Sequence, residues 1–380
     1  MTEGLPKIEF VDLKAQYKQL KSEIDGRIAA VLEHGRFIGG PEVGEFERAL
    51  ATYAGVEHAV GVANGTDALH IALMAENIGE ADAVFVPSFT FTATAEVILS
   101  CGATPVFCEV DARDFNIGCD DLERRIQETL KSGTLKPKAI IAVDLFGLPA
   151  DYARLEKIAD QYGLFLLADS AQSFGGGYGA GRVGSLAPAT AASFFPAKPL
   201  GCYGDGGALL TDDGARAEIY RSIGAHGKGS AKYDIVRLGK NSRLDTIQAG
   251  ILLAKLQVFD AELDVREKTA TLYDERLHDI VETPFRHNDR QSAWAQYAIL
   301  LDNRDAVAER LSIAGIPTAI YYPLPMHLQS AYTEFGDGQG SLPVSETLSR
   351  RILNLPMHPY LAAGDIDRIC TVIRDAIDGG

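Results

Sequence analysis

The stretch between residues 58 and 211 constrains the fold most, because short apolar runs alternate there with amphipathic segments. The runs that we expect to be strands cover residues 58–63, 83–87, 104–110, 139–143, 164–169, 190–194 and 207–211. Between them, segments such as 66–76, 120–131 and 152–162 have helical periodicity. Nearly continuous apolar strands separated by helices predict a mainly parallel sheet that is covered by helices on both faces.

Helical segments flank this region on both sides. Residues 13–33 and 42–54 precede it, and residues 244–277, which are long and helical, follow it. The tail contains strand candidates at 295–301 and 318–322 and helix candidates at 306–314, 344–353 and 366–377. We therefore predict an α/β fold with N-terminal helices and a large domain over residues 1–257 and a small C-terminal α+β domain over residues 258–380.

The charge and the cysteines exclude several classes of protein. Lys and Arg number 36 against 52 Asp and Glu, and this net charge of −16 disfavours binding to nucleic acid or to anionic membranes. The N-terminus lacks an apolar stretch behind a basic start, and the apolar runs are too short to span a bilayer. The five cysteines form no CxxC pair, so we expect reduced packing residues of a cytoplasmic protein and no metal site.

A turn of small residues, Asn64-Gly65-Thr66-Asp67, joins the first predicted strand to the following helix. The free amides and the dipole at such a helix start favour an anion, and a phosphate is one that fits. An ordinary N-cap made by Thr66 or Asp67 is the alternative interpretation.

Asp169 stands at the carboxyl end of the very apolar run 164–168, where ligands bind in parallel sheets. A carboxylate there would be poorly solvated unless a cation shared the site. The protonated nitrogen of a pyridine ring is one such cation. A carboxylate that caps the next helix is the alternative.

Lys198 follows Asp169 by 29 residues, between Pro196 and Pro199 and ahead of a glycine-rich stretch. Such rigid surroundings with few charges lower the pKa of an amine and favour Schiff-base chemistry. A lysine with a buried stem on a glycine-rich turn is the alternative. Phe91 could stack on a pyridine ring, although a phenylalanine is more often a core residue.

Residues 221–243 are basic in an acidic chain. They contain Arg221, Lys228, Lys232, Arg237, Lys240 and Arg243 against the single acid Asp234, and His226 in addition. We interpret this segment as a binding site for a diphosphate and for carboxylates, with His226, Lys228 and Arg243 as candidate substrate contacts. A solvated basic loop is the alternative.

In their joint order these segments resemble the DegT/DnrJ/EryC1/StrS family of nucleotide-sugar aminotransferases, which share the type I fold of aminotransferases that depend on pyridoxal 5′-phosphate. The resemblance runs from about Phe10 to Tyr360. Its most specific parts are residues 40–43, 64–69, 169–172 and 193–207.

The resemblance implies pyridoxal 5′-phosphate as the cofactor and gives individual residues a role. Lys198 would bind the cofactor covalently and shuttle protons, and Asp169 would pair with the pyridine nitrogen. The implied further contacts to the cofactor are Gly65, Thr66, Phe91, Gln172 and Ser193, and Asn241 of the Gly239-Lys-Asn-Ser-Arg243 segment from a partner subunit. The resemblance therefore also implies a homodimer with shared active sites.

Within the family, residues 195–205, 237–248 and 355–360 are similar to the UDP-2-acetamido-2-deoxy-3-keto-hexuluronate aminotransferases of bacterial O-antigen synthesis. This similarity implies glutamate as the amino donor, which leaves as 2-oxoglutarate, and a UDP-linked keto sugar as the acceptor. Tyr321 and Tyr322 would line the sugar pocket, unless they belong to an ordinary half-buried strand.

The chain departs from this subgroup at Tyr321, where His is usual, and at Gly250, where Ala is usual. The first departure leaves the sugar open, so an aminotransferase for a 4-keto-6-deoxy sugar nucleotide is an alternative. A sugar dehydratase of the same fold would carry His in place of Lys198. A non-catalytic regulator that binds pyridoxal phosphate is the remaining alternative.

Overall fold

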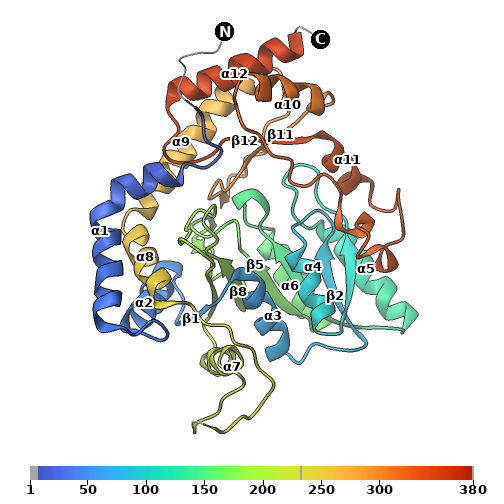
Figure 1. Cartoon of the computed structure of the whole chain (residues 1–380). Helices are drawn as coiled ribbons and strands as arrows, with labels where there is room; N and C mark the ends of the chain where they lie inside the picture. The colour runs from blue at the N-terminus through green and yellow to red at the C-terminus, as the bar shows by residue number, and fades with distance from the viewer. Residues whose placement is uncertain (1–6, 232, 379–380) are drawn as a thin grey trace.

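The main sheet of the computed structural model, which describes residues 7–231 and 233–378, has the strand order β1-β9-β8-β5-β4-β2-β3 (Figure 1). Its strands are β1 (His58–Val62), β2 (Asp82–Pro87), β3 (Thr104–Cys108), β4 (Lys136–Val143), β5 (Phe165–Asp169), β8 (Ala189–Ser193) and β9 (Gly207–Thr211). Strands β3, β2, β4, β5 and β8 are parallel, whereas β9 is antiparallel to both β8 and β1. The predicted mainly parallel sheet is therefore confirmed.

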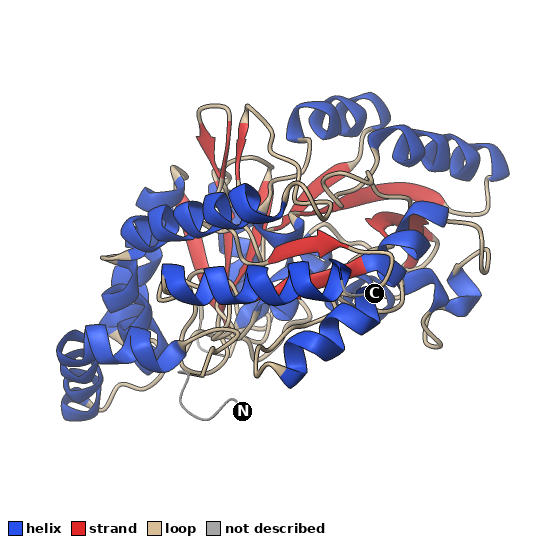
Figure 2. Ribbon diagram, turned by 90° about the horizontal axis from the view of Figure 1, so that it is seen from above, coloured by secondary structure: helices blue, strands red, loops and turns tan. Residues whose placement is uncertain are grey.

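Helices cover both faces of this sheet (Figure 2). One face packs against α3 (Gly65–Ala75), α4 (Ala93–Ser100) and α7 (Gly214–Gly224). The other face packs against α5 (Cys119–Ser132) and α6 (Tyr152–Tyr162), and further along against α2 (Pro41–Ala54) and α8 (Thr246–Leu256). Successive strand residues point to opposite faces, so Val84 and Val86 face the first layer and Ala83 and Phe85 the second.

The C-terminal part forms its own core around a two-stranded sheet. Its elements are α9 (Phe259–Leu277), β11 (Tyr297–Leu300), α10 (Arg304–Ile313), α11 (Pro343–Arg351), β12 (Ile352–Leu355) and α12 (Ala363–Asp378). The elements not yet named are α1 (Leu13–His34), β6 (Gly177–Tyr178), β7 (Gly181–Arg182), β10 (Arg290–Gln291) and the short turns η1 (Leu145–Gly147), η2 (Met326–Leu328) and η3 (Thr333–Phe335). In the described residues no helix is long and apolar enough to cross a membrane.

Two predictions for the C-terminal half are wrong. The segment 244–277 is not one helix, because α8 packs beside the main sheet while α9 packs into the C-terminal core. The break between α8 and α9 at 257–258 coincides with the predicted domain boundary. The division into two domains stays a prediction. Residues 318–322 form no strand. Only Ala319 pairs there, in an isolated bridge to Asn354, and the strand that pairs with β11 is β12.

The carboxyl ends of β4 and β5 are held together by Asp144, which is fully buried. Its carboxylate accepts four hydrogen bonds of 2.6–2.9 Å, from the amide of Ala150 and the hydroxyls of Tyr152, Ser170 and Ser173. Burial raises the pKa of Asp144 to about 6, although these four donors oppose the shift. Asp144 therefore fixes the turn that follows Asp169.

We predict that Asp144→Asn lowers the melting temperature, and that its deficit relative to the wild type shrinks as the pH rises from about 4 to about 6. The raised pKa means that the folded wild type binds a proton in this window that the unfolded chain has released, so the stabilisation from Asp144 is lost as the pH rises through 6. Thermal unfolding at a series of pH values measures the deficit. Asp120→Asn, at an exposed position, controls for the lost charge, and a deficit that grows with pH would contradict the prediction.

Candidate active site

The ends of β1, β8 and β9 bring the start of α3 against Ser193. Gly207 pairs with Val62 on one side and with Ser193 on the other. A Cβ atom at Gly207 would lie 2.5 Å from the backbone of Asn64, and one at Gly65 would lie 2.7 Å from Cβ of Ser193. Glycine is therefore required at both positions for this close approach.

The first turn of α3 presents free amides beside Ser193. The side chain of Asn64 caps the helix by accepting a hydrogen bond of 2.7 Å from the amide of Asp67. The cap is thus Asn64, and not Thr66 or Asp67 as in the alternative interpretation. The amides before Asp67 have no partner inside the helix, so Gly65 and Thr66, with the hydroxyl of Ser193, can hold a phosphate.

Asp169 ends β5 and is 6% exposed. Its Oδ2 accepts a hydrogen bond of 2.8 Å from the hydroxyl of Thr94, and its Oδ1 accepts a longer one of 3.3 Å from the amide of Ala171. Burial raises the pKa of Asp169, while these two donors and the charge of Lys198 lower it. No cation forms an ion pair with this carboxylate in the described residues, so Oδ1 can accept from a further cationic donor.

Lys198 is half-buried in the irregular segment between β8 and β9, in a turn closed by its amide, which donates to the carbonyl of Phe195 at 2.8 Å. Burial lowers the pKa of its amine, and the negative charge of Asp169 partly offsets this effect. The two side chains are therefore close enough for their charges to interact. A lowered pKa increases the neutral fraction of an amine, and the neutral form is the nucleophile.

Gln172 and Tyr322 form one wall of this region. Gln172 accepts from the amide of Phe146 at 2.7 Å and donates to the hydroxyl of Tyr322 at 3.3 Å. The ring of Tyr322 lies 6.2 Å from that of Phe91, at an angle of 39°. Phe91 is 54% exposed, so its ring remains accessible to a planar group.

Tyr321 sits next to this wall but outside any strand. Its amide donates to the side chain of Asn354 at 3.1 Å, and its ring meets that of Phe10 edge-on at 6.3 Å. Tyr321 and Tyr322 pack against a cluster that includes Phe89, which brings the predicted sugar-pocket residues next to Gln172.

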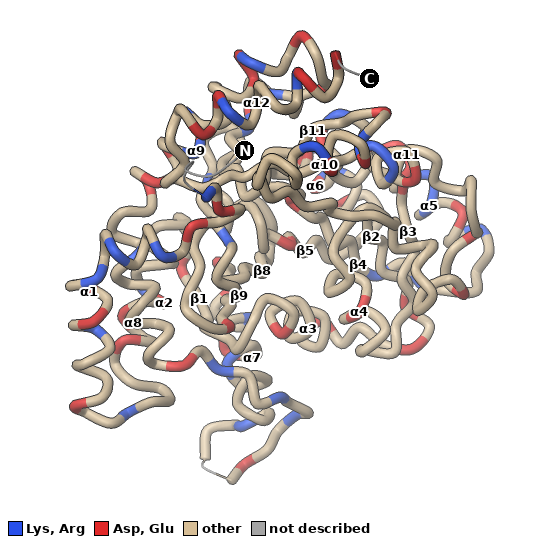
Figure 3. The backbone as a smooth tube through the Cα atoms, turned by 45° about the horizontal axis from the view of Figure 1, so that its top comes forward, with Lys and Arg blue, Asp and Glu red and all other residues tan. Residues whose placement is uncertain are grey.

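The predicted contacts from the basic segment lie elsewhere in this chain. The connection between α7 and α8 projects beyond α7, away from the end of β5 (Figures 1 and 3). His226, Lys228, Asn241 and Arg243 are exposed on it, and Arg243 donates to Asn241 at 2.7 Å. These four side chains are therefore not brought together with Lys198 in a single chain.

Part of the charge of this basic segment is neutralised within the chain. Arg221 pairs with Glu47 at 2.8 Å, and Lys240 pairs with Asp67 in the first turn of α3. Lys232 lies outside the described residues. The exposed cations that remain for a ligand include Lys228 and Arg243.

Sequence reasoning missed Thr94, which donates to Asp169 across 75 residues of chain. The helix α4 that carries Thr94 was not predicted either. Small and hydroxyl residues in the stretch 90–95 gave no periodic pattern that distinguishes a helix from a loop.

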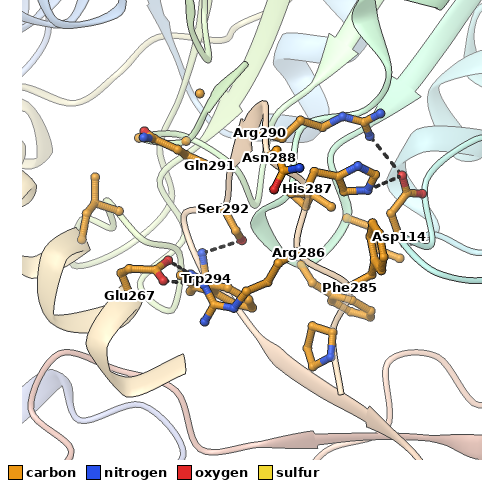
Figure 4. A pocket seen from close by; sticks show the side chains of 18 of the residues that line it. Asp114, Glu267, Phe285, Arg286, His287, Asn288, Arg290, Gln291, Ser292 and Trp294 are labelled. Carbon is orange, nitrogen blue, oxygen red and sulfur yellow. Dashed lines mark hydrogen bonds and ion pairs between the residues drawn. The ribbon is translucent and has the colours of Figure 1, made fainter. Parts of the chain in front are cut away.

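A separate cavity of about 760 Å³ lies between the β6–β7 hairpin, α9 and residues 284–292 (Figure 4). None of Lys198, Asp169 and Ser193 lines it. Its basic side chains face acids of the chain: Arg290 and His287 both point to Asp114, and Arg286 points to Glu267 (Figure 4). This cavity is therefore separate from the strand ends at which Lys198, Asp169 and Ser193 lie.

The residues at the strand ends fit pyridoxal phosphate. The start of α3 with Ser193 suits the phosphate, buried Asp169 suits the protonated ring nitrogen, and Lys198 suits the aldehyde carbon. The unfilled acceptor capacity of Asp169 is the observation in this structure that points to a bound cation.

Comparisons with known proteins agree with this fit. The model of the DegT/DnrJ/EryC1/StrS aminotransferase family matches residues 18–374. The chain is similar to the UDP-2-acetamido-2-deoxy-3-oxo-D-glucuronate aminotransferase of Pseudomonas aeruginosa, with 44% identity over 97% of this chain and 100% of that protein.

Two solved structures extend the comparison. A DegT DnrJ EryC1 StrS aminotransferase from Brucella abortus is 50% identical, with a TM-score of 0.96 over 97% of this chain and 99% of that one. The structure of S. venezuelae DesV in complex with a ketimine intermediate is 36% identical, with a TM-score of 0.93 over 98% of both chains. The family, the fold class and the cofactor expected from the sequence are confirmed. The chain belongs to the DegT/DnrJ/EryC1/StrS aminotransferase family and is an aminotransferase that depends on pyridoxal phosphate.

Proposed function

We propose that the enzyme transfers the amino group of glutamate to UDP-2-acetamido-2-deoxy-3-keto-glucuronate and so makes a 3-amino sugar for a surface polysaccharide. The transamination is supported by one observation: Lys198, Asp169 and the start of α3 lie together at one edge of the sheet. The choice of sugar is supported by the 44% identity to the Pseudomonas aeruginosa enzyme. The five free thiols are consistent with a reducing compartment, and we propose the cytoplasm.

In this proposal the described residues divide the work of holding the cofactor. Gly65, Thr66 and Ser193 bind the phosphate, Gln172 lies next to the phenolic oxygen, and Phe91 covers the ring. Asp169 keeps a proton on the ring nitrogen, because its buried carboxylate is poorly solvated and gains from a cation beside it. When bound, pyridoxal phosphate supplies the electron sink that makes a Cα proton of the donor acidic.

Lys198 is the residue that moves protons. Its amine takes the proton from Cα of glutamate and delivers it to C4′ of the cofactor, and in the second half-reaction it carries a proton in the reverse direction to the sugar carbon. Burial lowers the pKa of this amine and so increases its neutral fraction, which is the form that a general base requires.

The basic segment supplies the substrate contacts in trans. A uronate and a diphosphate are both anionic, and the planar guanidinium of Arg243 can bind a carboxylate through two parallel hydrogen bonds. Arg243 is therefore proposed to bind the donor α-carboxylate and the uronate, and His226 and Lys228 the diphosphate. Asn241, held by Arg243, reaches the cofactor of the partner subunit.

A homodimer is supported by the apolar side chains on the same segment. Ile235, Val236 and Leu238 are 59%, 52% and 87% exposed, on a connection that projects from the chain. Exposed apolar residues clustered on one projecting segment are typical of a protein interface. The proposed partner is a second copy of the chain. Asn241 and Arg243 are expected at the pocket but lie away from it in a single chain, and both belong to this projecting segment.

A neutral 4-keto-6-deoxy sugar nucleotide is the second candidate acceptor. It is favoured by Tyr321, which stands where His is usual in the uronate subgroup and adds no positive charge to the wall beside Gln172.

The acceptor can be tested directly. With glutamate, the purified enzyme should aminate UDP-2-acetamido-2-deoxy-3-keto-glucuronate with ping-pong kinetics, because the donor product leaves before the sugar enters. Mass spectrometry of the product and 2-oxoglutarate release measure the reaction, and Lys198→Ala is the inactive control. A much higher kcat/KM for a neutral 4-keto-6-deoxy sugar nucleotide would overturn the uronate assignment but not the transaminase.

Asp169→Asn should retain the fold and lose activity by a factor of about 10² or more, since the neutral amide cannot hold the proton on the ring nitrogen. Single-turnover reaction with glutamate isolates the proton transfer from sugar binding. Asp169→Glu, which keeps the charge but moves it, should recover part of the rate. Near-normal turnover of the Asn variant would remove Asp169 from this role.

Subunit exchange tests the shared site. Lys198→Ala and Arg243→Ala homodimers should each be nearly inactive, because every site lacks one required side chain. After equal mixing and exchange, half of the dimers are hybrids with one intact site, so about a quarter of the wild-type activity should return. Native mass spectrometry verifies the exchange. If hybrids form and activity does not return, Arg243 serves the pocket of its own chain.

A further inference from the structure

Lys255, in the last turn of α8, is 1% exposed and is among the largest fully buried side chains of the described residues. A lysine is rarely buried without an acid beside it. No carboxylate of the described residues lies within ion-pair distance of its Nζ. Its amine is therefore held by other groups, and their position in the chain indicates its role.

Both groups that hold the amine belong to the segment that follows Lys198. Nζ of Lys255 donates to the carbonyl of Gly201 at 2.5 Å and lies 4.1 Å from the ring centre of Tyr203. The carbonyl and the face of the ring are both electron-rich, and both attract an N–H donor. Lys255 thus connects α8 to a point three residues after Lys198.

Gln248 makes a second connection from the same helix to the same segment. It accepts from the amide of Tyr203 at 2.9 Å and donates to the carbonyl of Tyr203 at 3.2 Å. Gln248 and Lys255 are seven residues apart, which is about two helical turns of 3.6 residues, so they project from one side of α8. The irregular segment is therefore attached to a regular helix at two points.

Gly201 transmits this attachment to the turn that carries Lys198. A Cβ atom at Gly201 would lie 2.5 Å from the carbonyl oxygen of Pro196 and 2.7 Å from that of Phe195. The backbone of Gly201 therefore packs directly on the turn that the amide of Lys198 closes onto Phe195. A shift of Gly201 has to move this turn.

We propose that Lys255, assisted by Gln248, is a positioning residue that fixes the Lys198 turn from behind by holding the backbone of Gly201 and Tyr203. Lys255 touches neither substrate nor cofactor in this proposal, which rests on the proposed role of Lys198 in catalysis. Its amine contributes a hydrogen-bond donor at a position that is inaccessible to water.

This donor persists through a change of protonation. Burial lowers the pKa of Lys255 to about 8, and the negative charges of Cys202 and Glu262, where present, oppose the shift. Both the ammonium and the neutral amine carry N–H groups, so the bond to Gly201 survives on either side of this pKa. The attachment is thus maintained whether Lys255 is protonated or not.

The chain offers a matched control in Arg266 of α9. Arg266 is 4% exposed and donates to two carbonyls, those of Trp294 at 2.9 Å and Met357 at 3.2 Å. It is therefore also a buried cation that holds backbone carbonyls, but in the C-terminal core. Its replacement should cost stability without moving the Lys198 turn.

The experiment compares Lys255→Met, Lys255→Arg and Arg266→Met as loaded holoenzymes. Lys255→Met should speed hydrogen exchange in the peptide 194–206 by about tenfold or more, because the open segment is populated more often. Its kcat should fall about 10- to 100-fold with little change in KM for the sugar, because a displaced Lys198 slows the chemical step and leaves sugar binding unchanged. The pH midpoint of the visible absorbance of the bound cofactor should shift as well.

Lys255→Arg retains a donor and should recover part of the kcat and of the exchange protection. Arg266→Met should leave the exchange of 194–206 and the absorbance midpoint unchanged while it lowers the melting temperature. If Lys255→Met does not fold, Gln248→Leu tests the second attachment in the same way. The proposal would be overturned if peptide 194–206 exchanged its amide hydrogens at the same rate in Lys255→Met as in the wild type. If Gln248→Leu is used in place of Lys255→Met, the same outcome applies to it.

The result is separable from the role of Lys198. Reduction with borohydride followed by peptide mapping shows which lysine binds the cofactor, and a lysine other than Lys198 would refute the proposed function. The exchange of 194–206 reports on the attachment by Lys255 whatever that mapping shows.

Discussion

The close approach of α3 to the end of β8 is the contact on which the site depends. Strand β9 lies between β1 and β8, so the chain that leaves β1 has to pass directly over the start of β9 to reach Ser193. Only a residue without a side chain at 207 leaves room for that passage. This passage places the start of α3 beside Ser193, at the edge of the sheet that also carries Asp169 and the Lys198 segment.

Two neighbouring buried carboxylates differ in how many hydrogen-bond donors they meet. Asp144 is saturated with four donors and holds the turn after β5 in place. Asp169 has two donors, one of them long, and keeps the capacity to accept another. The difference arises from the surrounding hydroxyl groups and not from burial, because both side chains are almost inaccessible to water.

The periodicity of the sequence predicted the main sheet and the strand ends at which Asp169 and Ser193 lie, since buried parallel strands leave a local apolar signal. The contacts of Thr94 and Lys255 leave no such signal, because each joins residues more than 50 positions apart. The break after α8 and the position of β12 were missed for a related reason. Both features depend on which of the two cores a segment packs into. The spacing of apolar residues along the sequence does not specify that core.

The unfilled capacity of Asp169 also connects cofactor supply to the lifetime of the protein. A buried carboxylate without a cation raises the free energy of the folded state, and a ligand that provides the cation lowers it again. Molecules that have lost or not yet acquired the vitamin-derived group therefore open more often than loaded ones. Because cellular proteases act on opened chains, we expect a shortage of the vitamin-derived group to lower the amount of the enzyme as well as its rate.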